Sequence, residues 1–191
     1  MSERKRTKTQ RAILHAAKVL YEKQGVGNVT FDDIAETAGV CRTTVFNHFA
    51  DAGELQQALA VAEIGELIEF GEGSQLRGLP LVYALMDKLI DDTANYPRVM
   101  ARLANATILG GESGRVSEIE RLIARQFEQE FGAALSQGKI SAGLLAQMTM
   151  GLYYGQVNHQ LAFGLSFDAE QMRNQMRVML ELLLSGMRAG E

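Results

Sequence analysis

Residues 30–49 read TFDDIAETAGVCRTTVFNHF, and this stretch predicts two short helices joined by a tight turn. Thr30 is expected to cap the first helix with its hydroxyl, and Asp33 stands three residues on, where a capping box places an acidic side chain. Gly39 can take the positive φ with which helices commonly end. A helix, a turn that contains glycine and a second helix together form the helix-turn-helix unit of DNA-binding proteins.

The second helix of this pair, from about Arg42 to Phe49, divides its side chains between two faces. Val45 and Phe49 are four residues apart and are expected to face the interior. The other face carries side chains that suit base edges and phosphates in the major groove of DNA. These candidate DNA contacts are Arg42, Thr43, Thr44, Phe46, Asn47 and His48. The alternative is a solvated face of an ordinary helical domain, because helical hairpins also occur in proteins that bind no DNA.

The composition is that of a chain that can bury a sizeable core. Of its 191 residues, 47% are hydrophobic and only two are proline. No alternating strand pattern occurs and apolar residues recur at helical spacing, so an all-α fold of about nine helices is expected. No run of about 18 apolar residues is present, and no apolar signal core follows the basic N-terminus, so we expect a cytoplasmic protein without membrane spans. Cys41 is the single cysteine, which excludes an intrachain disulfide.

The charges are distributed unevenly along the chain. The formal net charge is −4, yet residues 1–11 contain five Lys or Arg side chains against one Glu. Residues 1–60 carry eight basic and seven acidic side chains, whereas residues 61–191 carry 11 and 16. This asymmetry fits a protein that touches phosphate with one end only. The basic segment adds Arg4, Lys5, Arg6 and Lys8 to the candidate DNA contacts, and the alternative is a solubilising tail.

The last two predicted helices, at about 141–164 and 168–187, are unusually apolar. The second of them carries apolar side chains nearly all round after Val178, and a helix of that kind is expected to be buried. In a chain of this size the expected cover is a second subunit. Two helices from each partner would then form a four-helix bundle about a two-fold axis, so we expect a homodimer.

Two segments carry a family resemblance: RAILHAAKVLYEKQGVGNVTFDDIAETAGV at residues 11–40 and CRTTVFNHFADAGEL at residues 41–55. They resemble the DNA-binding domain of TetR-family transcriptional regulators. The remainder is similar to that family only in being helical and of suitable length. The resemblance implies a DNA-binding domain at residues 1–50, with three helices and the basic arm, and a ligand-binding and dimerisation domain at residues 51–191.

The same resemblance implies a function. Each subunit of a homodimer is expected to place its second motif helix in the major groove of a palindromic operator on double-stranded DNA. Most members of the family repress transcription, and a small-molecule effector bound in the C-terminal domain releases them. A ligand-released repressor is therefore the expected function.

The resemblance also assigns roles to single residues. Arg42 and Thr43 match positions that contact bases, and Thr44 and His48 match positions that contact phosphate or bases. Thr30 matches the helix start at which a hydroxyl and backbone N–H groups meet a phosphate.

Two positions depart from the family pattern, and both are expected to lower the affinity for DNA phosphates. Phe46 stands where a phosphate-contacting Tyr is usual, and Ala52 stands where a Lys is usual. Asp32 and Asp33 add negative charge near the same surface. The basic arm is expected to compensate by reaching a neighbouring groove or phosphate.

The effector is expected to bind among the C-terminal helices, where a few polar groups interrupt apolar ones, as in small-molecule sites. The run YYGQVNHQ at residues 153–160 is the clearest case. The candidate effector contacts are Tyr83, Tyr96, Met100, Asn105, Met148, Tyr153, Tyr154, Gln156, Asn158 and His159. The alternative is that Asn158 and His159 are satisfied polar contacts of the dimer interface, and that the methionines belong to the core.

Other classes of function have less support. The three histidines lack metal-ligand spacing, and no glycine-rich phosphate loop follows a strand, so no catalytic residue, metal site or cofactor is expected. Cys41 opens the second motif helix, where a lowered thiol pKa would permit a redox switch, and a simple replacement of the usual Ser is the alternative. A helical module that binds another protein is the second functional class, and it lacks the steep salt dependence of a DNA binder.

Overall fold

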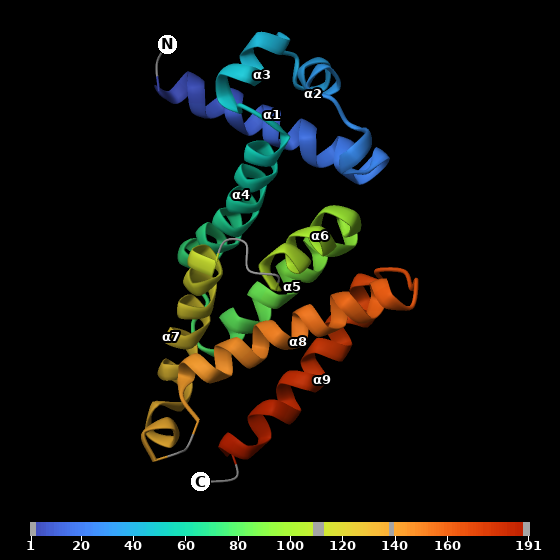
Figure 1. The fold of residues 1–191 in the computed structure, drawn as a ribbon. Helices are drawn as coiled ribbons and strands as arrows, with labels where there is room; N and C mark the ends of the chain where they lie inside the picture. The colour runs from blue at the N-terminus through green and yellow to red at the C-terminus, as the bar shows by residue number, and fades with distance from the viewer. Residues whose placement is uncertain (1–2, 109–112, 138–139, 189–191) are drawn as a thin grey trace. The chain divides into compact units, whose positions relative to one another are not determined.

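The structure, a computed structural model, describes residues 3–108, 113–137 and 140–188, and all the regular elements in these ranges are helical. In chain order the elements are α1 (Glu3–Gln24), the 3-10 turn η1 (Val26–Asn28), α2 (Phe31–Ala38), α3 (Arg42–His48), α4 (Ala52–Gly73), α5 (Leu79–Asn95), α6 (Pro97–Ile108), α7 (Ser113–Gln137), α8 (Ala142–Ala162) and α9 (Ala169–Arg188) (Figure 1). The all-α fold with nine helices in the described ranges is confirmed. Phe131 departs from helical φ and ψ, so α7 consists of two segments joined by a kink.

Local chemistry explains several helix boundaries. Pro97 opens α6, a position that needs no backbone N–H. Ser141 caps α8, because its Oγ accepts a hydrogen bond from the Leu144 N–H at 3.1 Å. The basic N-terminal segment is part of a helix, because α1 already begins at Glu3. Glu, Lys and Arg are good helix formers, and no proline or glycine stops the helix in this segment.

The chain packs as two compact units. The N-terminal unit comprises Met1–Glu63 together with Tyr96–Val99, and the C-terminal unit comprises Ile64–Asn95 together with Met100–Glu191. The boundaries run through α4 and through the first turn of α6, so each of these helices belongs to both units. The division into a DNA-binding domain and an effector domain, expected at residues 50 and 51, stays a prediction about function.

The N-terminal unit is a three-helix core around the helix-turn-helix. α1 packs against α2, and α2 packs against α3; both short helices lie on the same side of α1 (Figure 1). The side chains at its centre are almost completely buried and include Ile13, Ile34, Val45, Phe49 and Leu55. Burying each such side chain contributes about 1.5–3 kcal/mol, so this small core fixes the angle between the two motif helices.

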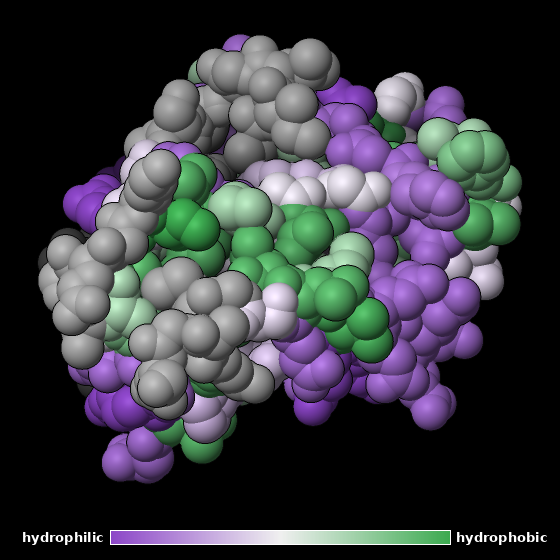
Figure 2. Space-filling view, turned by 90° about the horizontal axis from the view of Figure 1, so that it is seen from below, coloured by the Kyte–Doolittle hydropathy of each residue, from purple (hydrophilic) through white to green (hydrophobic). Residues whose placement is uncertain are grey.

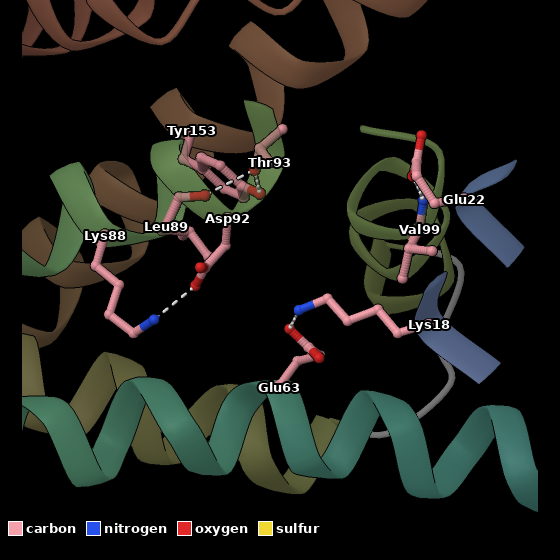
Figure 3. Close-up of polar contacts among 9 residues, drawn as sticks. All are labelled: Lys18, Glu22, Glu63, Lys88, Leu89, Asp92, Thr93, Val99 and Tyr153. Atoms are coloured by element: carbon pink, nitrogen blue, oxygen red, sulfur yellow. Dashed lines mark hydrogen bonds and ion pairs between the residues drawn. The ribbon is translucent and has the colours of Figure 1, made fainter. Parts of the chain in front are cut away.

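A set of polar contacts joins α1 to α4 and to the start of α6 within the N-terminal unit (Figure 3). The Lys18 Nζ lies 2.6 Å from a Glu63 carboxylate oxygen and 4.2 Å from the centre of the Tyr96 ring. The Glu22 carboxylate accepts hydrogen bonds from two backbone N–H groups at the start of α6, including that of Val99 at 3.2 Å. A carboxylate from α1 therefore caps α6, which begins with proline and has no capping hydroxyl of its own.

The C-terminal unit is a bundle in which α8 packs against α7 and α9, and α5 packs against α7 and α9. Figure 1 shows α8 and α9 side by side, running in opposite directions. Ion pairs join α5 to α9: Asp87 with Arg177 at 2.7 Å, and Asp91 with Arg173. Within the described ranges, none of the helices has the length and apolar character needed to cross a membrane.

Candidate nucleic-acid interface

A capping box between Thr30 and Asp33 closes the start of α2. The Thr30 Oγ1 accepts a hydrogen bond from the Asp33 N–H at 3.3 Å and donates one to the Asp33 carboxylate at 2.6 Å. That carboxylate also accepts from the Thr30 N–H at 2.8 Å, and these bonds hold the pKa of Asp33 below its usual value. The cap predicted from the sequence is confirmed. Because the box engages the Thr30 hydroxyl, contact with a DNA phosphate requires this hydroxyl to exchange its partner.

The turn after α2 fixes α3 against the core by one face. Gly39 adopts φ 66°, and the Val40 N–H donates to the Ala35 carbonyl at 3.0 Å, which ends α2 in a left-handed turn. Val45 is fully buried and Phe49 is 2% exposed, as their spacing predicted. The opposite face of α3 is therefore directed to solvent.

The solvent-directed face of α3 brings the predicted DNA contacts of this helix together. Arg42, Thr43, Phe46 and Asn47 are exposed, and Thr44 and His48 are half-buried. These six residues form one surface, called the α3 face below. An α-helix is the element that the major groove of DNA admits, and contact between the α3 face and DNA stays a prediction.

The Arg42 side chain is held by contacts on two sides. Its Nη1 lies 2.7 Å from Oδ2 of Asp32 on α2, and its guanidinium carbon lies 5.4 Å from the centre of the Phe46 ring, within the range of a cation–π contact. The Phe46 ring is itself supported by Phe31, with ring centres 4.9 Å apart. We call these four residues the Arg42 cluster. The two charged side chains are 61% and 59% exposed, so their ion pair adds little stability; together with the Phe46 ring it places the guanidinium between two partners.

The Arg42 cluster contains partners that sequence reasoning missed. The sequence identifies Asp32 only as a negative charge near the DNA and gives Phe31 no role. Asp32 and Arg42 are ten residues apart on different helices, so no helical spacing predicts their contact. One sequence signal could have indicated this contact. Asp32 and Arg42 carry opposite charges in the first turns of two helices that a tight turn joins.

Cys41 is the exposed N-cap residue of α3. Its Sγ lies 3.0 Å from the Thr44 Oγ1, and this hydrogen bond is the main cause that lowers the pKa of the thiol below its ordinary value. The contact engages the Thr44 hydroxyl, another predicted phosphate partner. A redox switch, the alternative role for Cys41, would depend on this thiol alone.

His48 lies at the end of α3, within electrostatic range of the basic start of α1. Partial burial, followed by the positive charge of Arg6, lowers the pKa of the imidazole below its ordinary value. The expected arm differs from the structure, because these basic residues belong to the first turns of α1 rather than to an extended segment. Arg6 and Lys8 are exposed there, and the side chains of Arg4 and Lys5 lie outside the described residues.

The start of α4 carries carboxylates where the family pattern has a lysine. Ala52 is exposed in the first turn. The Asp51 carboxylate accepts a hydrogen bond from the Glu54 N–H at 2.9 Å, and the Glu54 carboxylate accepts one from the Ala50 N–H at 2.6 Å. These bonds cap the helix well. They also place two negative charges at the start of α4, shortly after α3 in the chain, which opposes a phosphate contact at this point.

The predicted effector contacts are spread over differing environments. Met100, Tyr153 and Gln156 are buried, Tyr83, Tyr96, Asn105, Tyr154 and Asn158 are half-buried, and Met148 and His159 are exposed. Tyr96 belongs to the N-terminal unit, where it contacts Lys18. Asn105 and Asn158 each donate to a backbone carbonyl of their own helix. The buried polar candidates are therefore Tyr153 and Gln156.

Tyr153 and Gln156 lie one turn apart on α8 and differ in how well they are paired. The Tyr153 hydroxyl lies 2.7 Å from the Thr93 Oγ1, which itself donates to the Leu89 carbonyl, so the tyrosine is the donor (Figure 3). Burial raises the pKa of Tyr153 well above its ordinary value. Gln156 donates to the Met172 carbonyl at 3.0 Å, and its Oε1 has no hydrogen-bond partner among the described residues. An unpaired buried acceptor is costly and is a feature of binding sites as well as of imperfect cores.

Metal ligands do not gather in the part of the chain that the structure describes. There, no group of three or more His, Cys, Asp or Glu side chains lies close enough to hold a metal ion.

The sequence of this chain is similar to those of known regulatory proteins. The family model for bacterial regulatory proteins of the tetR family matches residues 13–59. The HTH-type transcriptional regulator TtgR of Pseudomonas putida is 45% identical over 51 residues, which are 27% of this chain and 24% of TtgR. The match therefore spans about a quarter of the length of that relative. The HTH-type transcriptional regulator AcrR of Shigella flexneri is 25% identical over 193 residues, which cover 92% of this chain and 89% of AcrR.

Solved structures share the fold over most of the chain. FadR of Thermus thermophilus, a TetR-family transcriptional repressor in complex with lauroyl-CoA, is similar with a TM-score of 0.60. Its sequence is 19% identical, and the alignment covers 90% of this chain and 93% of FadR. At this level of identity the likeness concerns the fold alone.

Proposed function

We propose that this chain, whose residues 13–59 match the model of the tetR family of bacterial regulatory proteins, is a DNA-binding transcriptional regulator that acts as a ligand-released homodimeric repressor. This is the role of a transcription factor and not of an enzyme. The observation that carries the proposal is the α3 face, which presents Arg, Thr, Asn and His side chains on a helix anchored from behind. Arginine suits guanine, asparagine suits adenine, and threonine suits phosphate or the thymine methyl group.

The α3 face is proposed to enter the major groove, one subunit in each half of a palindromic operator. The two half-sites of such an operator lie about one turn of DNA apart, roughly 34–36 Å, so the symmetry of the protein matches that of the DNA. Arg42, Thr43 and Asn47 are assigned to base edges, and Thr44 and His48 to phosphates or bases. Arg6 and Lys8 supply positive charge from α1.

A second copy of the chain is proposed to cover the outer face of α8 and α9. Among the described residues, seven large apolar side chains remain exposed on these helices and the turn between them: Leu144, Met148, Leu161, Phe163, Leu165, Val178 and Leu182. Gly151 and Gly155, one turn apart on α8, have open space where a Cβ would stand, so another helix can approach closely. On the face seen in Figure 2, an apolar area lies next to hydrophilic side chains, and apolar surface of this kind is what interfaces bury.

An unidentified small molecule is proposed to bind in the C-terminal unit. FadR, which shares the fold, carries lauroyl-CoA. In this chain Tyr153 and Gln156 place buried polar groups on an otherwise apolar helix, which is the pattern of small-molecule sites. Binding there is expected to change the separation of the two α3 faces and so release the operator.

Fluorescence anisotropy with duplexes from the protein's own upstream region, at two salt concentrations, tests the DNA-binding proposal. Affinity for the preferred duplex should fall steeply with salt. Arg42→Ala should weaken it by about 1–3 kcal/mol and relax the preference at one base position. Arg125→Ala, which removes the same charge from an exposed site on α7, is the control. If no duplex binds at low salt, the protein-interaction function replaces this one; if Arg42→Ala binds every duplex as the parent does, the base assignment is wrong.

A further inference from the structure

The Arg42 cluster determines which bases the α3 face can read, an inference that rests on the proposed DNA-binding function. We propose that Asp32 is a specificity-determining positioning residue. Its carboxylate orients Arg42 for donation to a guanine and selects, beside that guanine, a base with an exocyclic amino group, which is cytosine or adenine.

The geometry fixes the guanidinium on two sides and leaves it open on the third. The bond between Arg42 Nη1 and Asp32 Oδ2, at 2.7 Å, uses one of the five N–H groups of the arginine. The Phe46 ring lies against the guanidinium, and Phe31 supports that ring from behind. The remaining N–H groups are available to an acceptor that approaches from solvent, because the side chain is 61% exposed.

This arrangement prepares Arg42 for a planar, two-pronged acceptor. A long exposed arginine otherwise samples many rotamers, and it must give up that freedom when it binds. Guanine offers O6 and N7 to such a fork in the major groove. When the groove closes over the cluster and removes water, the bond to Asp32 strengthens, so the orientation of the fork is kept in the complex.

The carboxylate itself discriminates between neighbouring bases. An ionised Asp only accepts hydrogen bonds. Cytosine N4 and adenine N6 donate in the major groove, whereas guanine O6 and thymine O4 are acceptors that a carboxylate repels. Asp32 also repels phosphates, so it lowers affinity for every sequence while it penalises wrong sequences more. Specificity obtained by penalising alternatives is a general strategy of recognition surfaces.

A general electrostatic role for Asp32 predicts a different result. If its carboxylate acts only as one more negative charge, its removal should raise the affinity for all duplexes by one common factor. Glu36 is the matched control, because it is an exposed carboxylate on the same helix one turn beyond Asp32. Glu36→Gln removes the same charge from α2 and leaves the Arg42 cluster intact.

Selection from a random duplex library, followed by anisotropy with the selected and a scrambled duplex, tests the proposal. The parent should select a guanine with cytosine or adenine beside it. Asp32→Asn should bind the scrambled duplex more tightly than the parent, lose the requirement at the neighbouring base, and lose about tenfold in discrimination between the two duplexes. Glu36→Gln should keep the selected sequence and the parent's discrimination. Far-UV circular dichroism confirms that each variant is folded.

A double-mutant cycle separates orientation of Arg42 from a general charge effect. In the Arg42→Ala background the guanine preference is already lost, so Asp32→Asn should have no further effect on it. The proposal is overturned if Asp32→Asn tightens both duplexes by the same factor and leaves the selected sequence unchanged. A parent protein that selects no sequence at all contradicts the DNA-binding function, which is a separate outcome.

Discussion

At the scale of single residues, Thr30 has two possible uses that compete for one hydroxyl. In the free protein that hydroxyl closes the capping box with Asp33. Thr30→Ala is therefore expected to lower the free energy of unfolding by about 1 kcal/mol, because the Asp33 N–H loses its acceptor. Urea denaturation followed by circular dichroism measures this. Thr43→Ala, the same change at an exposed position of α3, should stay within about 0.5 kcal/mol, and equal losses in the two variants would contradict the cap.

His48 predicts a pH dependence with a defined sign. Its pKa in the folded protein lies below the ordinary value of 6.5, so its contribution to stability is complete above that pH and is lost as the pH falls through the folded-state pKa. A DNA phosphate near the imidazole raises the pKa, so binding takes up a proton. Affinity for DNA should therefore rise as the pH is lowered from about 7.5 to about 5.5.

Anisotropy titrations at constant ionic strength measure this pH dependence. His48→Gln should remove most of it, whereas His15→Gln, at an exposed position on α1, should not. A pH dependence that survives in His48→Gln would assign the proton uptake to another group.

The candidate site was predictable residue by residue only where one helix carries it. Val45 and Phe49 share one face of a single helix, so periodicity alone indicates which side chains of α3 point outward. The contact between Lys18 and Glu63 spans 45 positions, and that between Asp32 and Arg42 joins different helices. Tertiary packing decides such pairs, and a single sequence contains no signal of comparable strength for them.

At the scale of elements, the turn between α2 and α3 depends on a left-handed residue. Gly39 has φ 66°, a conformation that costs a residue with a Cβ about 1–2 kcal/mol. Gly39→Ala should lower the free energy of unfolding by that amount and weaken DNA binding by tilting α3. Gly73→Ala is the control, since a Cβ at Gly73 meets open space and no positive φ. Thermal and urea unfolding compare the two variants; an unchanged Gly39→Ala would show that the turn adapts.

Helix boundaries were predictable where capping residues, proline or glycine mark them. Thr30, Gly39 and Ser141 all act at the ends that the sequence indicated, and Pro97 opens α6. The kink at Phe131 in α7 was not predicted, although Gly132 stands beside it and weakens the helix there. A glycine inside a long amphipathic pattern marks a place where a helix can bend but does not determine that it will.

At the scale of the whole molecule, the proposed dimer makes α9 a sensitive element. Leu182 is 69% exposed in the single chain, so Leu182→Glu should leave the folded chain stable but place a charge in the proposed interface. Sedimentation velocity should show a monomer, and affinity for a palindromic duplex should fall towards that for a half-site. Leu76→Glu, at an exposed leucine between α4 and α5, should remain dimeric. A dimeric Leu182→Glu would move the interface elsewhere.

The C-terminal unit shows why its function was less predictable than its fold. Core packing, a dimer face and an effector site all require apolar helices with occasional polar groups. Met100 is buried and Met148 is 41% exposed, yet both occur in similar apolar helical patterns. Periodicity therefore predicted the helices correctly and could not divide their side chains among these three uses.

The contribution of Tyr96–Val99 to the N-terminal unit has a consequence for the synthesis of the protein on the ribosome. The chain leaves this unit after Glu63 and returns to it only at Tyr96. When the helix-turn-helix emerges, Glu22 still awaits the backbone N–H groups at the start of α6 and Lys18 awaits the Tyr96 ring, and closing the intervening loop costs chain entropy. The N-terminal unit is therefore completed only after about half of the protein has been made. A message cut short within α5 yields a helix-turn-helix without Tyr96–Val99 and their contacts to Lys18 and Glu22.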